Sequence, residues 1–221
     1  MAQPEAKDTV VVLDLDDTLY EEADYHASGL AEVCHWIGSL YGIPVSAKLN
    51  ELRESGETDL LAGLCHLAEL PLSVKESLLW IYRLHKPKIS LTDEVSDFLR
   101  NLEARYQVAI LTDGRSISQR LKLKSLGLSH LPVYISEEHG GDKPSPVRFK
   151  LIMHEMIGLK YCYVGDNPKK DFIAPKLLGW KTIGLLNNGR NIHSQDLNNL
   201  TKEQTPNIWI KNISQVLDHI D

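Results

Sequence analysis

Six short apolar runs recur along the chain and have the composition of β-strands. They cover residues 9–13, 106–111, 132–135, 161–164, 181–186 and 207–210. β-Branched residues are frequent in them, and apolar positions follow one another without alternating with polar ones. A strand that is covered on both faces shows this continuous pattern, whereas a strand with one solvent-exposed face alternates. The runs therefore predict a sheet buried on both sides.

After residue 90, the stretches between these runs have the apolar spacing of helices. The predicted helices cover residues 92–104, 115–127, 145–158 and 170–179. Thr92 is a side-chain cap for the first, and Gly127 and Gly158 end the second and third. Pro175 lies inside the fourth helix, so this helix is either kinked or starts late. Strands and helices that alternate in this way indicate an α/β protein with a doubly wound parallel sheet.

The segment from residue 20 to residue 87 has a different pattern. It reads as a series of helices without a convincing strand, directly after the first strand. We interpret it as an inserted helical subdomain, so that residues 1–19 and 88–221 form the α/β core domain. The alternative is a helical lobe packed permanently on that core.

Composition narrows the class of protein. The 221 residues are 43% hydrophobic and 24% charged, with a formal net charge of −6, which is typical of a globular protein. Basic residues are scattered, as in RLKLKS (residues 120–125), which we interpret as the solvent-exposed face of a helix. A nucleic-acid-binding protein usually shows a concentrated basic face, so we expect no nucleic-acid partner. The oligomeric state stays open.

Three cysteines without a CxxC pair support neither a disulfide framework nor a structural zinc site. The first residues lack the basic and apolar regions of a signal peptide. No apolar run approaches the roughly 20 residues that span a bilayer. We therefore expect a cytoplasmic protein without a membrane partner.

Polar side chains follow four of the predicted strands at the point where each strand ends. Three aspartates crowd the end of the first strand, although carboxylates at this spacing repel one another. Parallel strands deliver their carboxyl ends to one edge of the sheet, where ligands bind. The residues collected there are Asp14, Asp16, Asp17, Thr112, Asp113, Gly114, Lys143, Asp166, Asn167 and Asp171.

This set suits the transfer of a phosphoryl group. Asp14 and Asp166 could coordinate Mg²⁺, which prefers a few carboxylates together with water and phosphate oxygens, and the ion would offset the repulsion among the acids. Lys143 and the Thr112 hydroxyl could neutralise and orient phosphoryl oxygens. One carboxylate could then form an aspartyl-phosphate while a second, two residues further on, transfers protons.

The motifs DLDDTLY, LTDG, KP and GDNPKKD resemble, in this order, motifs one to four of the haloacid dehalogenase superfamily of phosphohydrolases. The resemblance spans nearly the whole chain and implies a Rossmann-like core. It implies that Asp14 is the nucleophile, that Asp16 is the general acid and base, and that Thr112 and Lys143 bind the phosphoryl group. It further implies a Mg²⁺ site of Asp14, Asp166 and the backbone carbonyl of Asp16.

The same resemblance assigns supporting roles. Asp171 orients the lysine or a metal-bound water, and Asn167 belongs to the same motif. Asp113 stands where the family more commonly has asparagine, so it either faces the leaving group or shapes the turn with Gly114. Asp17 is interpreted as a turn or helix-start residue.

The helical insert resembles the type-1 cap of this superfamily, which closes over the site and contacts the leaving group. Candidate specificity residues lie near its two ends: Tyr25, His26, Arg83 and His85. The alternative interpretations of these four are packing at a hinge and a positive field that attracts an anionic substrate.

The sequence thus predicts a Mg²⁺-dependent phosphatase of a small phosphorylated metabolite, such as a phosphosugar, a polyol phosphate or a nucleotide. A phosphosugar mutase of the β-phosphoglucomutase type remains an alternative, because it uses the same pair of acids. A haloacid dehalogenase would lack the acid at position 16. A phospho-receiver or non-catalytic binding module is the alternative from another class.

Overall fold

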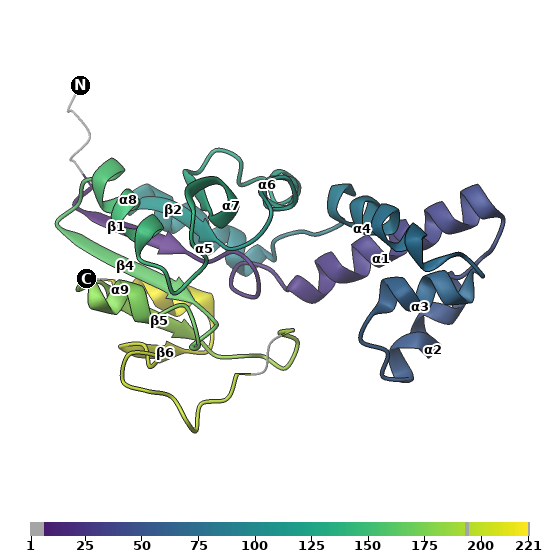
Figure 1. The fold of residues 1–221 in the computed structure, drawn as a ribbon. Helices are drawn as coiled ribbons and strands as arrows, with labels where there is room; N and C mark the ends of the chain where they lie inside the picture. The colour runs from purple at the N-terminus through teal and green to yellow at the C-terminus, as the bar shows by residue number, and fades with distance from the viewer. Residues whose placement is uncertain (1–6, 193–194, 221) are drawn as a thin grey trace. The chain divides into compact units, whose positions relative to one another are not determined.

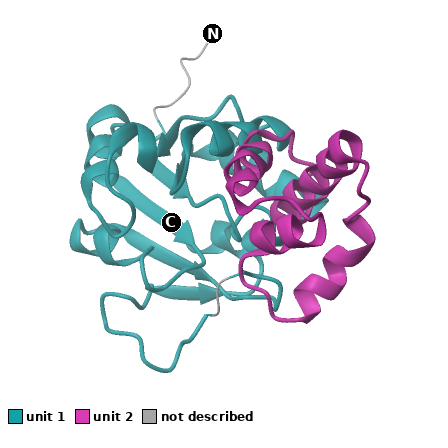
Figure 2. Ribbon diagram, turned by 45° about the vertical axis from the view of Figure 1, so that its right-hand side comes forward, with its two compact units in different colours: residues 1–23, 90–221 teal, residues 24–89 magenta. Residues whose placement is uncertain are grey.

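The computed structural model describes residues 7–192 and 195–220 of the 221. The chain forms two compact units, residues 1–23 with 90–221 and residues 24–89 (Figure 2). These bounds differ by a few residues from the predicted subdomain of residues 20–87.

The first unit is built on a six-stranded sheet with helices on its faces (Figure 1). Its strands are β1 (Thr9–Leu13), β2 (Gln107–Thr112), β3 (Val133–Ile135), β4 (Lys160–Gly165), β5 (Lys181–Leu185) and β6 (Ile208–Ile210). They lie in the order β3-β2-β1-β4-β5-β6, and every adjacent pair is parallel. The predicted α/β class and the doubly wound parallel sheet are confirmed.

The helices of this unit are α5 (Asp93–Arg105), α6 (Ser116–Ser125), α7 (Ser136–His139), α8 (Val147–Glu155) and α9 (Ile173–Leu177), with a 3₁₀ helix at Ile213–Asp218. The Thr92 side chain accepts a hydrogen bond from the Val95 amide and begins α5 as predicted. Gly127 has a φ of +75° just beyond α6, the left-handed conformation that ends many helices.

Helices α8 and α9 are shorter than predicted, and the late start of α9 is one of the two possibilities predicted for the helix that contains Pro175. Helix α8 ends at Glu155, where the backbone of Met156 becomes extended, so Gly158 does not end it. A Cβ at Gly158 would meet Val10 Cγ2 at 2.9 Å and the Asp8 carbonyl at 3.0 Å. Gly158 therefore permits a close approach to β1. Helix α9 starts late, at Ile173, so Pro175 falls within its first turn, where the missing N–H breaks no helical hydrogen bond.

Continuous burial of β1 explains its apolar sequence. Val10, Val11, Val12 and Leu13 have no exposed surface, because β1 is central and covered on both faces. On one face, Val10 and Val12 pack in a cluster with Phe149, Tyr163 and Trp180, among others. A rigid, buried strand thus leads into the three aspartates.

The second unit is helical, as predicted for this segment. It contains α1 (Glu22–Tyr41, which begins in the first unit), α2 (Leu49–Glu54), α3 (Leu60–Leu67) and α4 (Lys75–Leu84), with 3₁₀ turns at Ser46–Lys48 and Leu72–Val74. Its own core includes Val33, Ile37 and Leu64, none of which is exposed.

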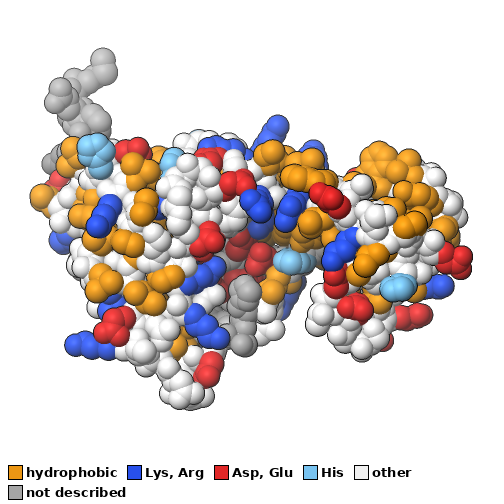
Figure 3. Space-filling model, in the orientation of Figure 1, with side chains coloured by type: hydrophobic (Ala, Val, Ile, Leu, Met, Phe, Trp, Pro, Cys, Tyr) orange, Lys and Arg blue, Asp and Glu red, His pale blue; other side chains and the backbone are white. Residues whose placement is uncertain are grey.

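Acidic and basic side chains are interspersed on the face of the molecule seen in Figure 3. None of the helices formed by the described residues has the length and apolar character needed to cross a membrane. All three cysteines are buried and free.

Candidate active site

A cavity of about 110 Å³ lies at the carboxyl ends of the strands. The chain runs from β1 through β2 to β3 on one side and continues from β4 on the other, so the order of strands reverses between β1 and β4. Open α/β sheets bind ligands at such a point. The cavity is lined by Asp14, Asp16, Asp17, Glu22, Thr112, Asp113, Lys143, Asp166, Asn167 and Lys170.

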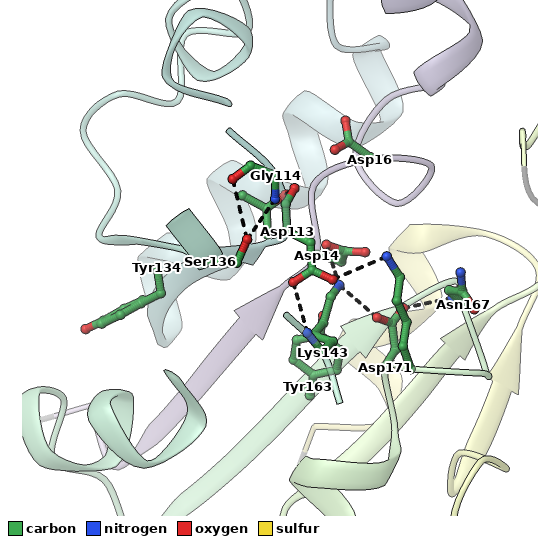
Figure 4. Close-up of polar contacts among 12 residues, drawn as sticks. Asp14, Asp16, Asp113, Gly114, Tyr134, Ser136, Lys143, Tyr163, Asn167 and Asp171 are labelled. Atoms are coloured by element: carbon green, nitrogen blue, oxygen red, sulfur yellow. Dashed lines mark hydrogen bonds and ion pairs between the residues drawn. The ribbon is translucent and has the colours of Figure 1, made fainter. Parts of the chain in front are cut away.

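Lys143 is the centre of a buried charge cluster (Figure 4). Its Nζ lies 2.9 Å from Asp14 Oδ1 and 2.7 Å from Asp171 Oδ1, and it donates a hydrogen bond of 3.0 Å to the Tyr163 hydroxyl. Burial by itself lowers the pKa of Lys143, but the Asp14 and Asp171 carboxylates outweigh it and hold that pKa well above its ordinary value. Lys143 is therefore an ammonium ion that orders both acids.

Asp14, Asp166 and Asp171 carry carboxylate oxygens within 4.8 Å of one another. Burial, opposed by Lys143 and reinforced by Asp171, raises the pKa of Asp14 to about 7. Burial, with repulsion from Asp171 and Asp14, raises the pKa of Asp166 to about 8. Even with Lys143 and the partly exposed Lys170, the three buried carboxylates keep an excess of negative charge, which a hard divalent cation with oxygen ligands would neutralise. The donor set fits Mg²⁺.

Hydrogen bonds hold in place Asp166 and Asp171, the two acids that follow β4. Asp171 accepts a hydrogen bond from the Asn167 amide at 2.8 Å, and Gly165 leaves room for it, since a Cβ there would lie 2.5 Å from Asp171 Oδ2. Asp166 accepts from the Asn191 side chain at 3.0 Å, and its backbone carbonyl accepts from Gln195 at 2.7 Å. Asn191 and Gln195 belong to an aperiodic segment that sequence reasoning missed.

Asp113 is held by cations of the protein itself. Its Oδ1 forms an ion pair with Arg148 and accepts the Lys143 amide at 3.1 Å, while its Oδ2 lies 3.3 Å from Lys170 Nζ. Burial would raise the pKa of Asp113, but these cations, Lys143 first, lower it below its ordinary value. These contacts engage both carboxylate oxygens of Asp113 while it lines the cavity, and both roles proposed for it from the sequence stay open.

Arg148 is fully buried and was not identified from the sequence. Besides Asp113, its guanidinium donates to the carbonyls of Thr112 (2.7 Å), Gly141 (3.0 Å) and Tyr134 (3.2 Å). It therefore ties together the ends of β2 and β3 and the loop that carries Lys143.

Asp16 lies apart from the cluster of Asp14 and Lys143 (Figure 4), and its side chain contacts helix α6 and Tyr20. Its Oδ1 accepts from Lys122 Nζ at 2.7 Å and from the Tyr20 hydroxyl, and its Oδ2 accepts from Gln119 at 2.8 Å. Burial alone would raise the pKa of Asp16, but Lys122 and the hydrogen bonds lower it. The prediction that residues 120–125 form only a solvent-exposed face is wrong for Lys122, whose side chain is 4% exposed.

Gln119 also connects Asp16 to the end of β2. Its side-chain nitrogen lies 3.0 Å from Thr112 Oγ1 and 2.6 Å from the Asp113 carbonyl. Thr112 itself is buried. Gln119 thus contacts both Asp16, the candidate general acid and base, and the hydroxyl of Thr112, the candidate phosphoryl-binding group.

Asp17 is a turn residue, as predicted. Its φ is +54°, and its carboxylate accepts from the amide of Glu22 at 2.8 Å and from the amide of Ile192 at 3.0 Å. It therefore joins the start of α1 to the segment that carries Asn191.

The four candidate specificity residues belong to the unit of residues 24–89. His85 is buried, with Nδ1 2.6 Å from the Tyr82 carbonyl and Nε2 3.1 Å from Ser28 Oγ. Tyr25 packs against the His85 and His26 rings at centroid distances of 5.1 and 6.1 Å. The Arg83 guanidinium lies 5.6 Å from the Trp80 ring centroid.

The family model of haloacid dehalogenase-like hydrolases matches residues 9–179. The chain belongs to this family. The match includes every residue that lines the cavity and ends before Asn191 and Gln195. No curated protein matches this hydrolase closely enough to be counted as a relative.

Solved structures share the fold of this hydrolase over almost its whole length. The magnesium-bound HAD-hydrolase YfnB from Bacillus subtilis is 18% identical, with a TM-score of 0.65 over 96% of this chain and 98% of that one. A 2-haloacid dehalogenase from Pseudomonas syringae is 20% identical (TM-score 0.63; 95% and 96% covered). A predicted phosphoglycolate phosphatase from Haemophilus somnus is 19% identical (0.60; 95% and 96%). At these identities the likeness shows the fold alone.

Proposed function

We propose that this hydrolase is a Mg²⁺-dependent phosphatase that acts on a small phosphorylated metabolite through an aspartyl-phosphate at Asp14. The observation that carries the proposal is the contact of 2.9 Å between Asp14 and the buried ammonium of Lys143, beside the carboxylates of Asp166 and Asp171. Lys143 stabilises Asp14 as a carboxylate, the form that attacks phosphorus.

The metal would be held by Asp14, Asp166 and the backbone carbonyl of Asp16, with Asp171 beside them. When bound, Mg²⁺ would neutralise charge on the phosphoryl oxygens and on the crowded acids. The structure of YfnB, which shares this fold, was solved with magnesium bound, and this is consistent with the choice of ion.

The chemistry then has two steps. In the first, an Asp14 oxygen forms a bond to phosphorus, the bond from phosphorus to the leaving oxygen breaks, and Asp16 gives its proton to that oxygen. In the second, Asp16 accepts a proton from a water that attacks phosphorus, the bond to Asp14 breaks, and orthophosphate leaves. The Lys122 contact favours the carboxylate form of Asp16, which the second step uses.

Asp16 also separates the phosphatase from a haloacid dehalogenase, because displacement of a halide needs no acid to protonate the leaving group. The structural likeness to a 2-haloacid dehalogenase does not change this argument, since its 20% identity carries the fold only. We further propose that residues 24–89 act as the type-1 cap and supply specificity through Tyr25, His26, Arg83 and His85.

Turnover of p-nitrophenyl phosphate and of a panel of phosphorylated metabolites, with MgCl₂ or EDTA, tests the proposal. We expect Mg²⁺-dependent release of orthophosphate, an acid-stable phosphoprotein trapped by rapid quenching, and loss of both in Asp14→Asn. Activity that survives Asp14→Asn, or metal-independent halide release from 2-haloacids without phosphatase activity, would contradict it. Isomerisation of a sugar phosphate without net orthophosphate release would indicate the mutase instead.

A further inference from the structure

Lys170 is a second ammonium at the cavity, and the proposed mechanism gives it no role. It follows β4 in the turn that also carries Asp171, and its amide donates to the Asn167 carbonyl at 3.2 Å. Its side chain lines the cavity together with Asp14, Thr112 and Lys143, and is 33% exposed. Its neighbour Lys169 is exposed and does not line the cavity.

The ion pair with Asp113 does not account for Lys170. Asp113 already has the guanidinium of Arg148 on Oδ1, and Arg148 is fully buried, with its other donors on backbone carbonyls. The contact from Lys170 to Asp113 Oδ2 is longer, at 3.3 Å. Because Arg148 already neutralises the charge of Asp113, the positive charge of Lys170 is available to stabilise negative charge in the cavity.

The two lysines differ in how fully their donors are used. An ammonium has three N–H donors, and Lys143 has three oxygen partners, on Asp14, Asp171 and Tyr163. Among the described residues, Lys170 has Asp113 as its ion-pair partner. The three N–H donors of Lys143 are therefore used by Asp14, Asp171 and Tyr163, whereas the ammonium of Lys170 can still donate hydrogen bonds to a ligand.

Lys170 is also within electrostatic reach of the nucleophile. Burial and Lys143 lower the pKa of Lys170, but Asp14, Asp113 and Asp171 together raise it above its ordinary value. In turn Lys170, after Lys143 the second cation to do so, lowers the pKa of Asp14. Lys170 thus carries its charge at the same cavity as the carboxylate that would attack phosphorus.

We propose that Lys170 binds a non-bridging oxygen of the phosphoryl group as a second ammonium beside Lys143. The ligand class is a phosphate monoester dianion, and the inference rests on the proposed phosphatase function. A phosphoryl group in a loose transition state carries its charge on three non-bridging oxygens, and each additional positioned cation stabilises that charge. Lys170 would then contribute to ground-state binding and to turnover.

The chain offers a matched pair of variants, Lys170→Met and Lys169→Met, with Lys170→Arg as a rescue. The measurements are kcat, KM and the inhibition constant of orthophosphate in saturating MgCl₂, with Tm as a check on folding. We expect Lys170→Met to weaken orthophosphate inhibition about tenfold and to lower kcat/KM by a similar factor or more, the loss of one charge-assisted hydrogen bond. Lys169→Met should match the wild type, and Lys170→Arg should recover most of both losses.

An active Lys170→Met variant with unchanged orthophosphate inhibition would overturn the inference. So would equal losses in Asp113→Asn and Lys170→Met, because Lys170 would then act through Asp113. A wild-type protein that neither hydrolyses phosphate esters nor binds orthophosphate would instead refute the proposed function, and the inference with it.

Discussion

Lys122 on helix α6 forms an ion pair with Asp16 after β1, at 2.7 Å from Nζ to Oδ1. The Lys122 and Asp16 side chains are 4% and 18% exposed, so water solvates neither charge well. The pair brings together two residues that are 106 positions apart in the sequence. The ion pair of Lys122 and Asp16 therefore stabilises the packing of α6 against the loop that carries the candidate catalytic acids.

We expect Lys122→Met to destabilise the protein by about 3 kcal/mol, because it leaves a largely buried carboxylate without its cation. Lys124→Met is the matched control, since Lys124 lies on the same helix and is exposed; it should change the free energy of unfolding by less than about 0.5 kcal/mol. Urea unfolding measures both. Equal losses in the two variants would show that the pair does not stabilise the fold.

We expect the stability of the fold to depend more on Arg148 than on Lys122, because the Arg148 guanidinium has no exposed surface and contacts Asp113 and three carbonyls. Arg148→Met should cost about 3–5 kcal/mol, and Arg148→Lys should not recover it, since an ammonium lacks the planar fork. Arg100→Met is the control, because Arg100 pairs with Asp97 at the surface and is 77% exposed. A Tm of Arg148→Met equal to that of Arg100→Met would contradict this role.

The acids at the strand ends could be placed from the sequence because their positions follow from local rules. A buried run identifies each strand, and parallel strands bring the residues that follow them to one edge. Asp14, Asp166 and Asp171 meet there, with Lys143 between Asp14 and Asp171. Lys143 is less directly fixed, since it lies in the loop after β3, several residues beyond the strand end; the position of that loop pointed to it first, and the motif resemblance then supported it.

The residues that support these acids could not be placed in this way. Which face of α6 is buried depends on what packs against it, and RLKLKS has no apolar stripe that would mark Lys122 as internal. Arg148 resembles any charged helical residue until the carbonyls at the ends of β2 and β3 are located. Asn191 lies in a segment without periodicity, so only the folded chain brings it to Asp166.

Asp17 offers a test of the turn after β1. Its backbone has a φ of +54°, and its carboxylate accepts two amide hydrogen bonds. Asp17→Ala should cost about 2–3 kcal/mol, because two N–H groups lose their acceptor and alanine disfavours this conformation. Asp17→Asn should lose less, since asparagine tolerates positive φ and keeps one acceptor. Thermal unfolding of the two variants checks the order, and a smaller loss in Asp17→Ala would contradict it.

The raised pKa values of Asp14 and Asp166 determine how the free energy of unfolding depends on pH. In the metal-free protein the pKa values of Asp14 and Asp166 are about 7 and about 8, against an ordinary value of 3.8. Between these limits the folded protein binds more protons than the unfolded chain, so its stability decreases as the pH rises. The contribution is complete below the ordinary pKa of aspartate and is lost as the pH rises through the raised values. Asp16 and Asp113, whose pKa values are lowered, change stability only at more acidic pH.

We therefore expect the Tm of the protein in EDTA to fall from about pH 4 to about pH 8 and to level off above that range. Saturating MgCl₂ should remove this fall, because the ion binds the deprotonated carboxylates and its affinity increases over the same range. Asp166→Asn removes one of the two titrating groups, so its Tm in EDTA should depend less on pH than that of the wild type. A metal-free Tm that is constant or rises over this range would mean that Asp14 and Asp166 are already ionised without a cation.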